Sequence, residues 1–253
     1  MSAVSTESVA VNGVRSPVLC AGPRDQSEAV VFVHGNPGPA EDWRDLLSRV
    51  GDFARGVAPD MPGYGNADKP RDFRYTVDGY AEHLAGVLDA LGITRVHLVL
   101  HDFGGPWGLR WAIRHPDAFA SCTLINTGCL PDYRWHRYAR IWRTPVVGEL
   151  FQATANRNAF RLLLGRENPR LQPATLDRIY DAARTWPTKR AILALYRATP
   201  AKDVRGPIEE LGRRMAQSLL DQMGRKPAQP KEEVVPVRMI VRSSCGCLSS
   251  GGD

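Results

Sequence analysis

The sequence of 253 residues lacks several features that would place it in a special class of protein. No apolar run approaches the ~20 residues of a membrane span, and the N-terminus has neither the basic start nor the apolar centre of a signal peptide. The cysteines are odd in number and follow no framework spacing, and Cys245-Gly-Cys247 lacks the histidines or second pair of a zinc site. We therefore expect a cytoplasmic protein with no membrane partner, metal or cofactor.

The sequence also lacks a basic block or a nucleic-acid-binding motif. Its net charge of +6 comes largely from arginines spread along the chain, so we expect a solvated surface and no nucleic-acid partner. A composition of 43% hydrophobic and 24% charged residues is that of an ordinary globular protein, and the length allows one sizeable α/β domain.

Strand and helix patterns alternate along the first half of the chain. An Asn12-Gly13 turn predicts a hairpin, and short apolar runs after it predict strands buried on both faces. Alternation of strands with helices implies a mostly parallel sheet. The expected core covers residues 1–129, with apolar strands at 29–33, 95–102 and 120–128 and helices at 43–50, 76–91 and 108–115.

Residues 130–200 change to a helical pattern rich in arginine and aromatic residues, which is natural for a lid inserted after a sheet strand. One helix face carries Trp135, Tyr138 and Trp142, and arginines lie largely on the other. Such interleaving occurs in nucleic-acid and membrane-surface binding, but an amphipathic helix packed on its neighbours is the favoured interpretation.

An acidic residue stands where one of the buried strands ends. The run LVLHDFGGPWG leads from a strand through Asp102 into a helix, and Gly104 and Gly105 allow the two elements to approach closely. A carboxylate at such a turn, near a helix N-terminus, can attack an electrophilic sp3 carbon and form an ester. The alternative is that Asp102 only caps the helix.

Two further motifs decide between these interpretations. His34-Gly35-Asn36-Pro37 follows the first apolar strand, and Asp60-Met-Pro-Gly63-Tyr-Gly65 follows the next. With HDFGG, these motifs resemble the α/β-hydrolase family, and specifically its aspartate-nucleophile branch of epoxide hydrolases and haloalkane dehalogenases. The resemblance covers residues 9–200. It implies that Asp102 is the nucleophile, that the backbone N–H groups of Asn36 and Phe103 form the oxyanion hole, that residues 130–200 form a helical cap, and that the substrate is small and apolar.

The resemblance leaves two substrate classes open. Phe103 stands where dehalogenases typically carry a tryptophan, whose N–H can bind a departing halide, whereas Asn36 matches a halide-binding asparagine of some dehalogenases. Epoxide opening instead needs an acid, which cap tyrosines usually supply in this family. The candidates are Tyr133, Tyr138, Tyr180 and Tyr196, and we favour the epoxide interpretation.

The family also needs a histidine base and an acid that orients it, placed after the nucleophile in the chain. No histidine follows His136, and an alternative position for the acid holds the amide Asn126. His136 is the one histidine of the expected cap, and it is either a base or an ordinary polar residue of a surface helix. We expect the C-terminal part of the hydrolase core to be missing or replaced. The alternative to an enzyme is therefore a truncated, catalytically incompetent remnant that only binds ligands.

Residues 201–253 form an atypical tail with a predicted helix, a linker and a half-buried strand at 234–242. Residues 212–248 resemble the C-terminal end of sugar-binding-type bacterial transcription repressors. The strand could add to the sheet where a hydrolase strand belongs, but the tail brings no histidine.

Overall fold

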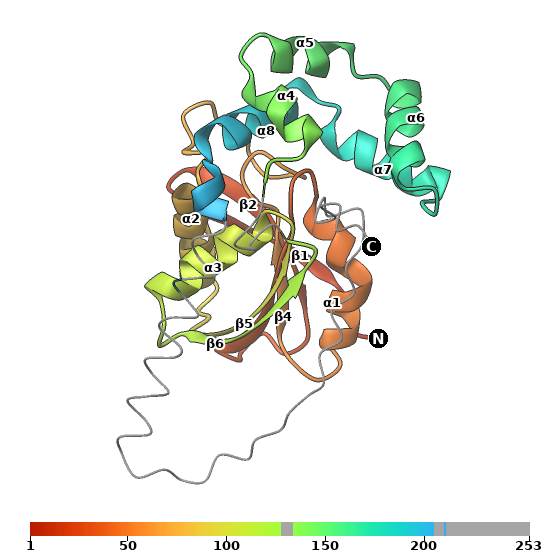
Figure 1. The fold of residues 1–253 in the computed structure, drawn as a ribbon. Helices are drawn as coiled ribbons and strands as arrows, with labels where there is room; N and C mark the ends of the chain where they lie inside the picture. The colour runs from red at the N-terminus through yellow and green to blue at the C-terminus, as the bar shows by residue number, and fades with distance from the viewer. Residues whose placement is uncertain (128–133, 205–209, 211–253) are drawn as a thin grey trace, which may run out of the picture.

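The computed structural model describes residues 1–127, 134–204 and 210. A six-stranded sheet forms its centre, in the order β1-β2-β4-β3-β5-β6 (Figure 1). The strands are β1 (Ser5–Val11), β2 (Val14–Ala21), β3 (Glu28–Val33), β4 (Gly56–Pro59), β5 (Arg95–His101) and β6 (Phe119–Ile125). The α/β-hydrolase fold class expected from the sequence is confirmed, with a mostly parallel sheet and helices.

Strand direction follows the connections between the strands. β1 and β2 form the predicted hairpin, with positive φ at Asn12 (51°) and Gly13 (80°), as a two-residue turn of this kind requires. β2 also pairs antiparallel with β4, whereas the pairs β3–β4, β3–β5 and β5–β6 are parallel. The carboxyl ends of β3 and β5 therefore meet at one edge of the sheet, which brings the segments after Val33 and His101 together.

Helices cover both faces of the sheet (Figure 1). On one face α1 (Arg44–Val50), preceded by the 3-10 turn η1 (Ala40–Trp43), packs Leu47 and Trp43 against Phe32. On the other face α2 (Val77–Ala90) and α3 (Gly104–Arg114) close over the larger apolar cluster. Alternate side chains of each strand thus enter two separate cores.

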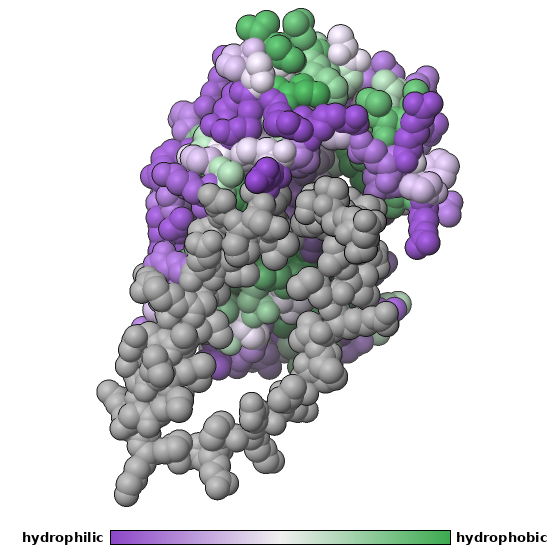
Figure 2. Space-filling view, in the orientation of Figure 1, coloured by the Kyte–Doolittle hydropathy of each residue, from purple (hydrophilic) through white to green (hydrophobic). Residues whose placement is uncertain are grey.

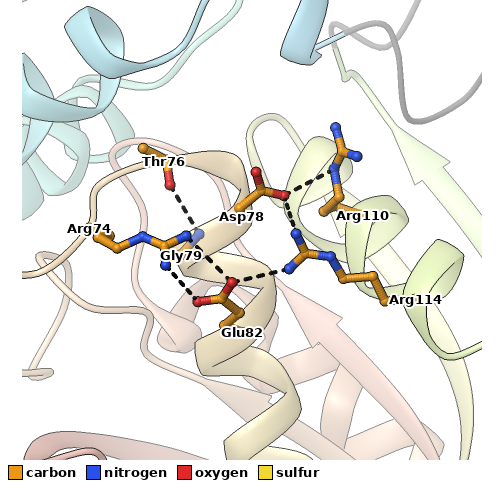
Figure 3. Close-up of polar contacts among 7 residues, drawn as sticks. All are labelled: Arg74, Thr76, Asp78, Gly79, Glu82, Arg110 and Arg114. Carbon is orange, nitrogen blue, oxygen red and sulfur yellow. Dashed lines mark hydrogen bonds and ion pairs between the residues drawn. The ribbon is translucent and has the colours of Figure 1, made fainter.

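Ion pairs on the surface join α2 to α3 (Figure 3). Asp78 pairs with Arg110 and Arg114, and Glu82 pairs with Arg114 and with Arg74. All of these side chains are at least partly exposed to solvent, so each pair adds little stability by itself. Together they connect the surfaces of α2 and of α3, the helix that begins directly after the Asp102 turn.

Five helices, named here the helical segment, lie above one end of the sheet (Figure 1). They are α4 (Arg137–Arg143), α5 (Val147–Thr154), α6 (Arg157–Glu167), α7 (Pro173–Ala183) and α8 (Trp186–Ala198). The helical pattern predicted for residues 130–200 is therefore present over 137–198. Whether this segment acts as a cap stays a proposal.

Two local expectations need correction. The helix after the Asp102 turn begins at Gly104, not Gly108, because a glycine pair and a proline are tolerated in a first turn, where N–H groups have no partners within the helix. The helix expected at 43–50 begins as the 3-10 turn at Ala40.

Strand β6 ends the sheet among the described residues, and both of its faces reach solvent. Leu124 and Ile125 are 39% and 38% exposed, unlike the apolar residues of β5. The expectations for the 234–242 strand and for the repressor resemblance lie outside the described residues and stay predictions. Within the described ranges, no helix is long and apolar enough to cross a membrane.

Candidate active site at the Asp102 turn

Asp102 lies at the sharp turn between β5 and α3. Its φ of 50° is in the left-handed region, which is uncommon for residues other than glycine and is found at strained functional turns. The backbone holds this conformation, because the Gly105 N–H donates to the Asp102 carbonyl oxygen at 3.0 Å and Thr127 Oγ1 donates to the same oxygen at 2.7 Å. The half-buried side chain is therefore presented at the edge of the sheet.

The carboxylate of Asp102 accepts a hydrogen bond from a different loop. The backbone N–H of Asn36 donates to Asp102 Oδ1 at 2.8 Å. Helix α3 begins after Phe103 with no side-chain cap, so the capping alternative gains no support. No hydrogen bond from the Phe103 N–H to Asp102 is present in the described part of the chain, and that half of the oxyanion hole stays a prediction.

Two glycines of the motifs permit this close approach. A Cβ at Gly35 would lie 2.3 Å from Asp102 Cβ, and a Cβ at Gly104 would lie 2.3 Å from the Val33 carbonyl oxygen. Both positions need a residue without a side chain, since real atoms do not approach so closely. Steric crowding thus explains why Gly35 and Gly104 occur at these positions of the motifs.

The remaining motif residues support the loop and are not placed for chemistry. His34 is buried, its Nδ1 donates to the Gly35 carbonyl oxygen at 2.8 Å, and its Nε2 accepts from the Met61 N–H at 2.9 Å. Burial lowers the pKa of His34, while nearby Asp60 opposes that shift. His34 is therefore neutral and has no free nitrogen for catalysis. The bond between Asn36 and Pro37 is a cis peptide.

Aromatic rings surround Phe103, the residue after Asp102. Tyr196 from α8 meets the Phe103 ring edge-on at 5.2 Å between centroids, and Trp135 stacks on it at 6.2 Å. Tyr196 is only 3% exposed. The helical segment thus contributes an apolar wall with one phenol beside the Asp102 turn.

The four candidate tyrosines have different surroundings. Among the three candidates that the structure describes, Tyr196 reaches the Asp102 turn, through its ring contact with Phe103. The Tyr138 hydroxyl lies at the surface, where it donates to Glu167 Oε1 at 3.1 Å and accepts from Arg137. Tyr180 lies between α6 and α7, beside Phe160 and beneath Arg157. Tyr133 lies outside the described residues.

His136 stands near the site with both ring nitrogens engaged. Its Nδ1 accepts the Ala139 N–H at 3.2 Å and so caps α4, which assigns the proton to Nε2. That nitrogen lies 3.3 Å from Tyr196 Oη, to which it donates. Desolvation lowers the pKa of His136, and the charge of Asp102 acts in the opposite direction. This arrangement makes His136 a partner of Tyr196 more readily than a base.

Sequence reasoning did not assign site roles to Thr127 or Trp135. Thr127 holds the Asp102 carbonyl oxygen, and Trp135 forms part of the wall beside Phe103. The position of Thr127 could have been predicted from the sequence. It follows a strand that is parallel to β5, so it lies at the same edge of the sheet as Asp102. Asn126 stands at the alternative position for the acid and has a φ of 45°. Its side chain is an uncharged amide, so it cannot act as the acid that orients a histidine.

Comparison of the sequence with known proteins identifies related families. A family model described as the alpha/beta hydrolase fold matches residues 28–164, more than half of the chain. A haloalkane dehalogenase of Agrobacterium fabrum is 34% identical over 179 residues, which are 68% of this chain and 58% of that protein. The chain therefore spans less than two thirds of the length of this relative.

Solved structures give the same result. A haloalkane dehalogenase from Bradyrhizobium elkani superposes with a TM-score of 0.70 at 27% identity, covering 85% of this chain and 77% of that one. An epoxide hydrolase from metagenomes of hot environments has a TM-score of 0.65 at 25% identity, covering 79% of this chain and 72% of that one. The matched sequence and the sheet that carries the Asp102 turn show that the chain belongs to the α/β-hydrolase fold family.

Proposed function

We propose that the chain uses Asp102 as a nucleophile toward small apolar epoxides, beneath a cap formed by the helical segment. The observation that carries this proposal is the hydrogen bond of 2.8 Å from the Asn36 N–H to Asp102 Oδ1. A donor on Oδ1 orients the carboxylate and leaves Oδ2 to attack. The same donor then stabilises the carbonyl oxygen of the ester, on which negative charge develops during hydrolysis.

Residues at the site can supply both the nucleophile and the acid that epoxide opening needs. Asp102 Oδ2 forms a bond to an epoxide carbon, and the C–O bond of the ring breaks. The ring oxygen takes a proton, for which Tyr196 is the best-placed donor because of its contact with Phe103 and its burial. The hydrogen bond from His136 Nε2 stabilises the tyrosinate that remains. The apolar walls formed by Phe103 and Trp135 favour an apolar substrate.

Haloalkane dehalogenation is the second candidate. Its support is the Asn36 side chain, whose Nδ2 and Oδ1 are both buried without a hydrogen-bond partner in the described chain. A buried unpaired amide donor is costly, and a halide leaving group would satisfy it. Phe103 weakens this candidate, since a phenyl ring offers no N–H for the second contact.

Intact-protein mass spectrometry tests both functions. After incubation with a small apolar epoxide, we expect one added mass equal to the epoxide, absent in Asp102→Asn because an amide is a poor nucleophile. With a chloroalkane the added mass is that of the alkyl group less one hydrogen, because chloride and the carboxyl proton are lost. An adduct that persists in Asp102→Asn would refute the assignment of the nucleophile. No adduct and no turnover with either class would favour the remnant that only binds ligands.

A further inference from the structure

The positive charge of the protein is concentrated in the helical segment. Residues 134–200 contain thirteen arginines and lysines against four acidic residues, whereas residues 1–127 contain eleven against fifteen. Basic residues occur along the whole chain, as expected, but the helical segment has few acidic residues to balance them. An acidic sheet core carries a strongly basic layer of helices.

The acidic residues of the helical segment are already used within it. Glu149 pairs with Arg197, Glu167 pairs with Arg137, and Asp177 and Asp181 pair with arginines of α6 and α7. Five further arginines of this segment are exposed and have no ion pair among the described residues: Arg134, Arg140, Arg166, Arg170 and Arg178. Arg178 acts electrostatically on Asp42 of the sheet core, so the other four are the cations that an external anionic surface could contact.

The same helices also expose several aliphatic side chains. Val146 is 68% exposed and Leu150 is 61% exposed at the start of α5, and Leu162 of α6 is 56% exposed. The opposite side of α5 faces α8, because Gly148 is close to Leu193 and Arg197. Figure 2 shows apolar surface at the top of the molecule, where Figure 1 places α5. We name Val146, Val147, Leu150, Leu162 and Leu163 the outer apolar patch.

The exposed residue Val146 has a strained backbone conformation. Its φ of 67° is in the left-handed region, where a β-branched residue is a genuine outlier. Val146 buries little of its side chain in return. A strained and exposed valine next to an exposed leucine is unexplained by packing within the described chain.

We propose that the outer apolar patch and the four other unpaired arginines of the helical segment, of which Arg166 follows Leu162 by one turn of α6, form a docking surface for an anionic lipid membrane. Aliphatic side chains enter the boundary between headgroups and acyl chains, and arginines attract acidic headgroups. A nucleic acid would pair with the arginines but would not bury the exposed aliphatic side chains. A second copy of the same face would bring like charges together. The sequence-based expectation of no membrane partner was drawn mainly from the lack of an apolar run long enough to span a membrane, a criterion that does not address binding at the membrane surface.

Vesicle co-sedimentation of the full chain tests the proposal. We expect binding to vesicles of phosphatidylcholine and phosphatidylglycerol in equal parts, little binding to phosphatidylcholine alone, and loss of binding in high salt. Leu150→Glu should weaken binding at least about tenfold, since it removes an inserting side chain and adds repulsion. The matched control is Phe53→Glu, since Phe53 is 76% exposed on the core and its replacement should leave binding unchanged.

Other outcomes would overturn the proposal. These are absent binding to the anionic vesicles, equal binding by Leu150→Glu, or equal loss in Phe53→Glu. A dimer in size-exclusion chromatography with light scattering that Leu150→Glu dissociates would assign the patch to a second copy. Binding to double-stranded DNA that is unaffected by Leu150→Glu, without vesicle binding, would assign the arginines to nucleic acid. Val146→Gly removes the strain and one apolar side chain, so a folded variant with weakened binding separates docking from stability.

Discussion

The sheet core and the helical segment differ in how completely they bury their side chains. Strand β4 is buried at every position, whereas α6 has no buried residue and α7 has one, Leu176. Within the helical segment α8 is the exception, because it buries seven residues and joins the larger apolar cluster. In the core the four inner strands each pair with a neighbour on both sides, while α6 packs chiefly against α7. The core and α8 therefore bury most of the apolar surface, and the core sets the position of Asp102, whereas α6 and α7 contribute mainly surface.

Removal of one hydroxyl from the helical segment should affect chemistry alone. Tyr196→Phe should slow adduct formation with an epoxide by about 10²–10⁴-fold, as expected for loss of a general acid, with little change in melting temperature. The rate is followed by intact-protein mass against time. The matched control is Tyr138→Phe, whose hydroxyl contacts Glu167 at the surface. Equal rates for both variants would show that Tyr196 is only part of the wall.

A buried histidine should make the core sensitive to acid. His83 is 3% exposed, its Nε2 lies 2.8 Å from Ser16 Oγ, and desolvation lowers its pKa from 6.5 to about 4. The unfolded chain therefore binds a proton below pH 6.5 that the folded chain does not bind until about pH 4. Stability should fall as the pH drops through that window, by about 3 kcal/mol in total.

Urea unfolding at pH 7 and at pH 4.5 measures this effect. His83→Gln can keep a hydrogen bond to Ser16 but does not titrate, so its stability should change less between the two pH values. The same loss in the wild type and in the variant would assign the acid sensitivity to other groups.

The close approach at Gly35 should couple stability to chemistry in the core. Gly35→Ala places a methyl group 2.3 Å from Asp102 Cβ. We expect a loss of about 1–3 kcal/mol from overpacking together with loss of the adduct, measured by urea unfolding and by mass. In the same loop, Gly38→Ala is the control, because the nearest atom to its Cβ would lie at 3.4 Å. Wild-type behaviour of Gly35→Ala would mean that the two loops are not in contact.

Strand β6 offers the last test of the core. If the predicted strand at 234–242 pairs beside β6 and covers its exposed residues, deletion of residues 207–253 should lower the melting temperature by about 4–8 °C. This corresponds to about 2 kcal/mol for a chain of this size. Deletion of residues 243–253 alone leaves the predicted strand intact and should have little effect. An unchanged melting temperature in the longer deletion would remove the tail from the sheet.

Local patterns in the sequence predicted the core better than the helical segment, for a physical reason. The hairpin at Asn12-Gly13 and the turn at Asp102 depend on the conformational preferences of a few adjacent residues. The contact of Tyr196 with Phe103 and of His136 with Tyr196 joins residues far apart in the chain. No local pattern encodes such contacts, so four tyrosines remained as candidates. The exposure of β6 was equally unpredictable, because burial depends on which elements pack against a strand.

Hydrolysis of an ester on Asp102 needs a base, and the described residues place no histidine against this side chain. In the described chain no histidine forms a hydrogen bond with Asp102, and none follows His136 in the sequence. An ester on Asp102 should therefore form faster than it is hydrolysed, since general-base help contributes about 10²–10⁴-fold. His136→Ala should change little in ester hydrolysis, because both of its ring nitrogens are engaged.

The most direct measurement is the amount of epoxide consumed per molecule of protein over time. The account predicts a plateau at about one equivalent, with a persistent adduct on the peptide that contains Asp102 and no diol in excess of the protein. Continued consumption of many equivalents, lost in His136→Ala, would contradict the account and make His136 the base.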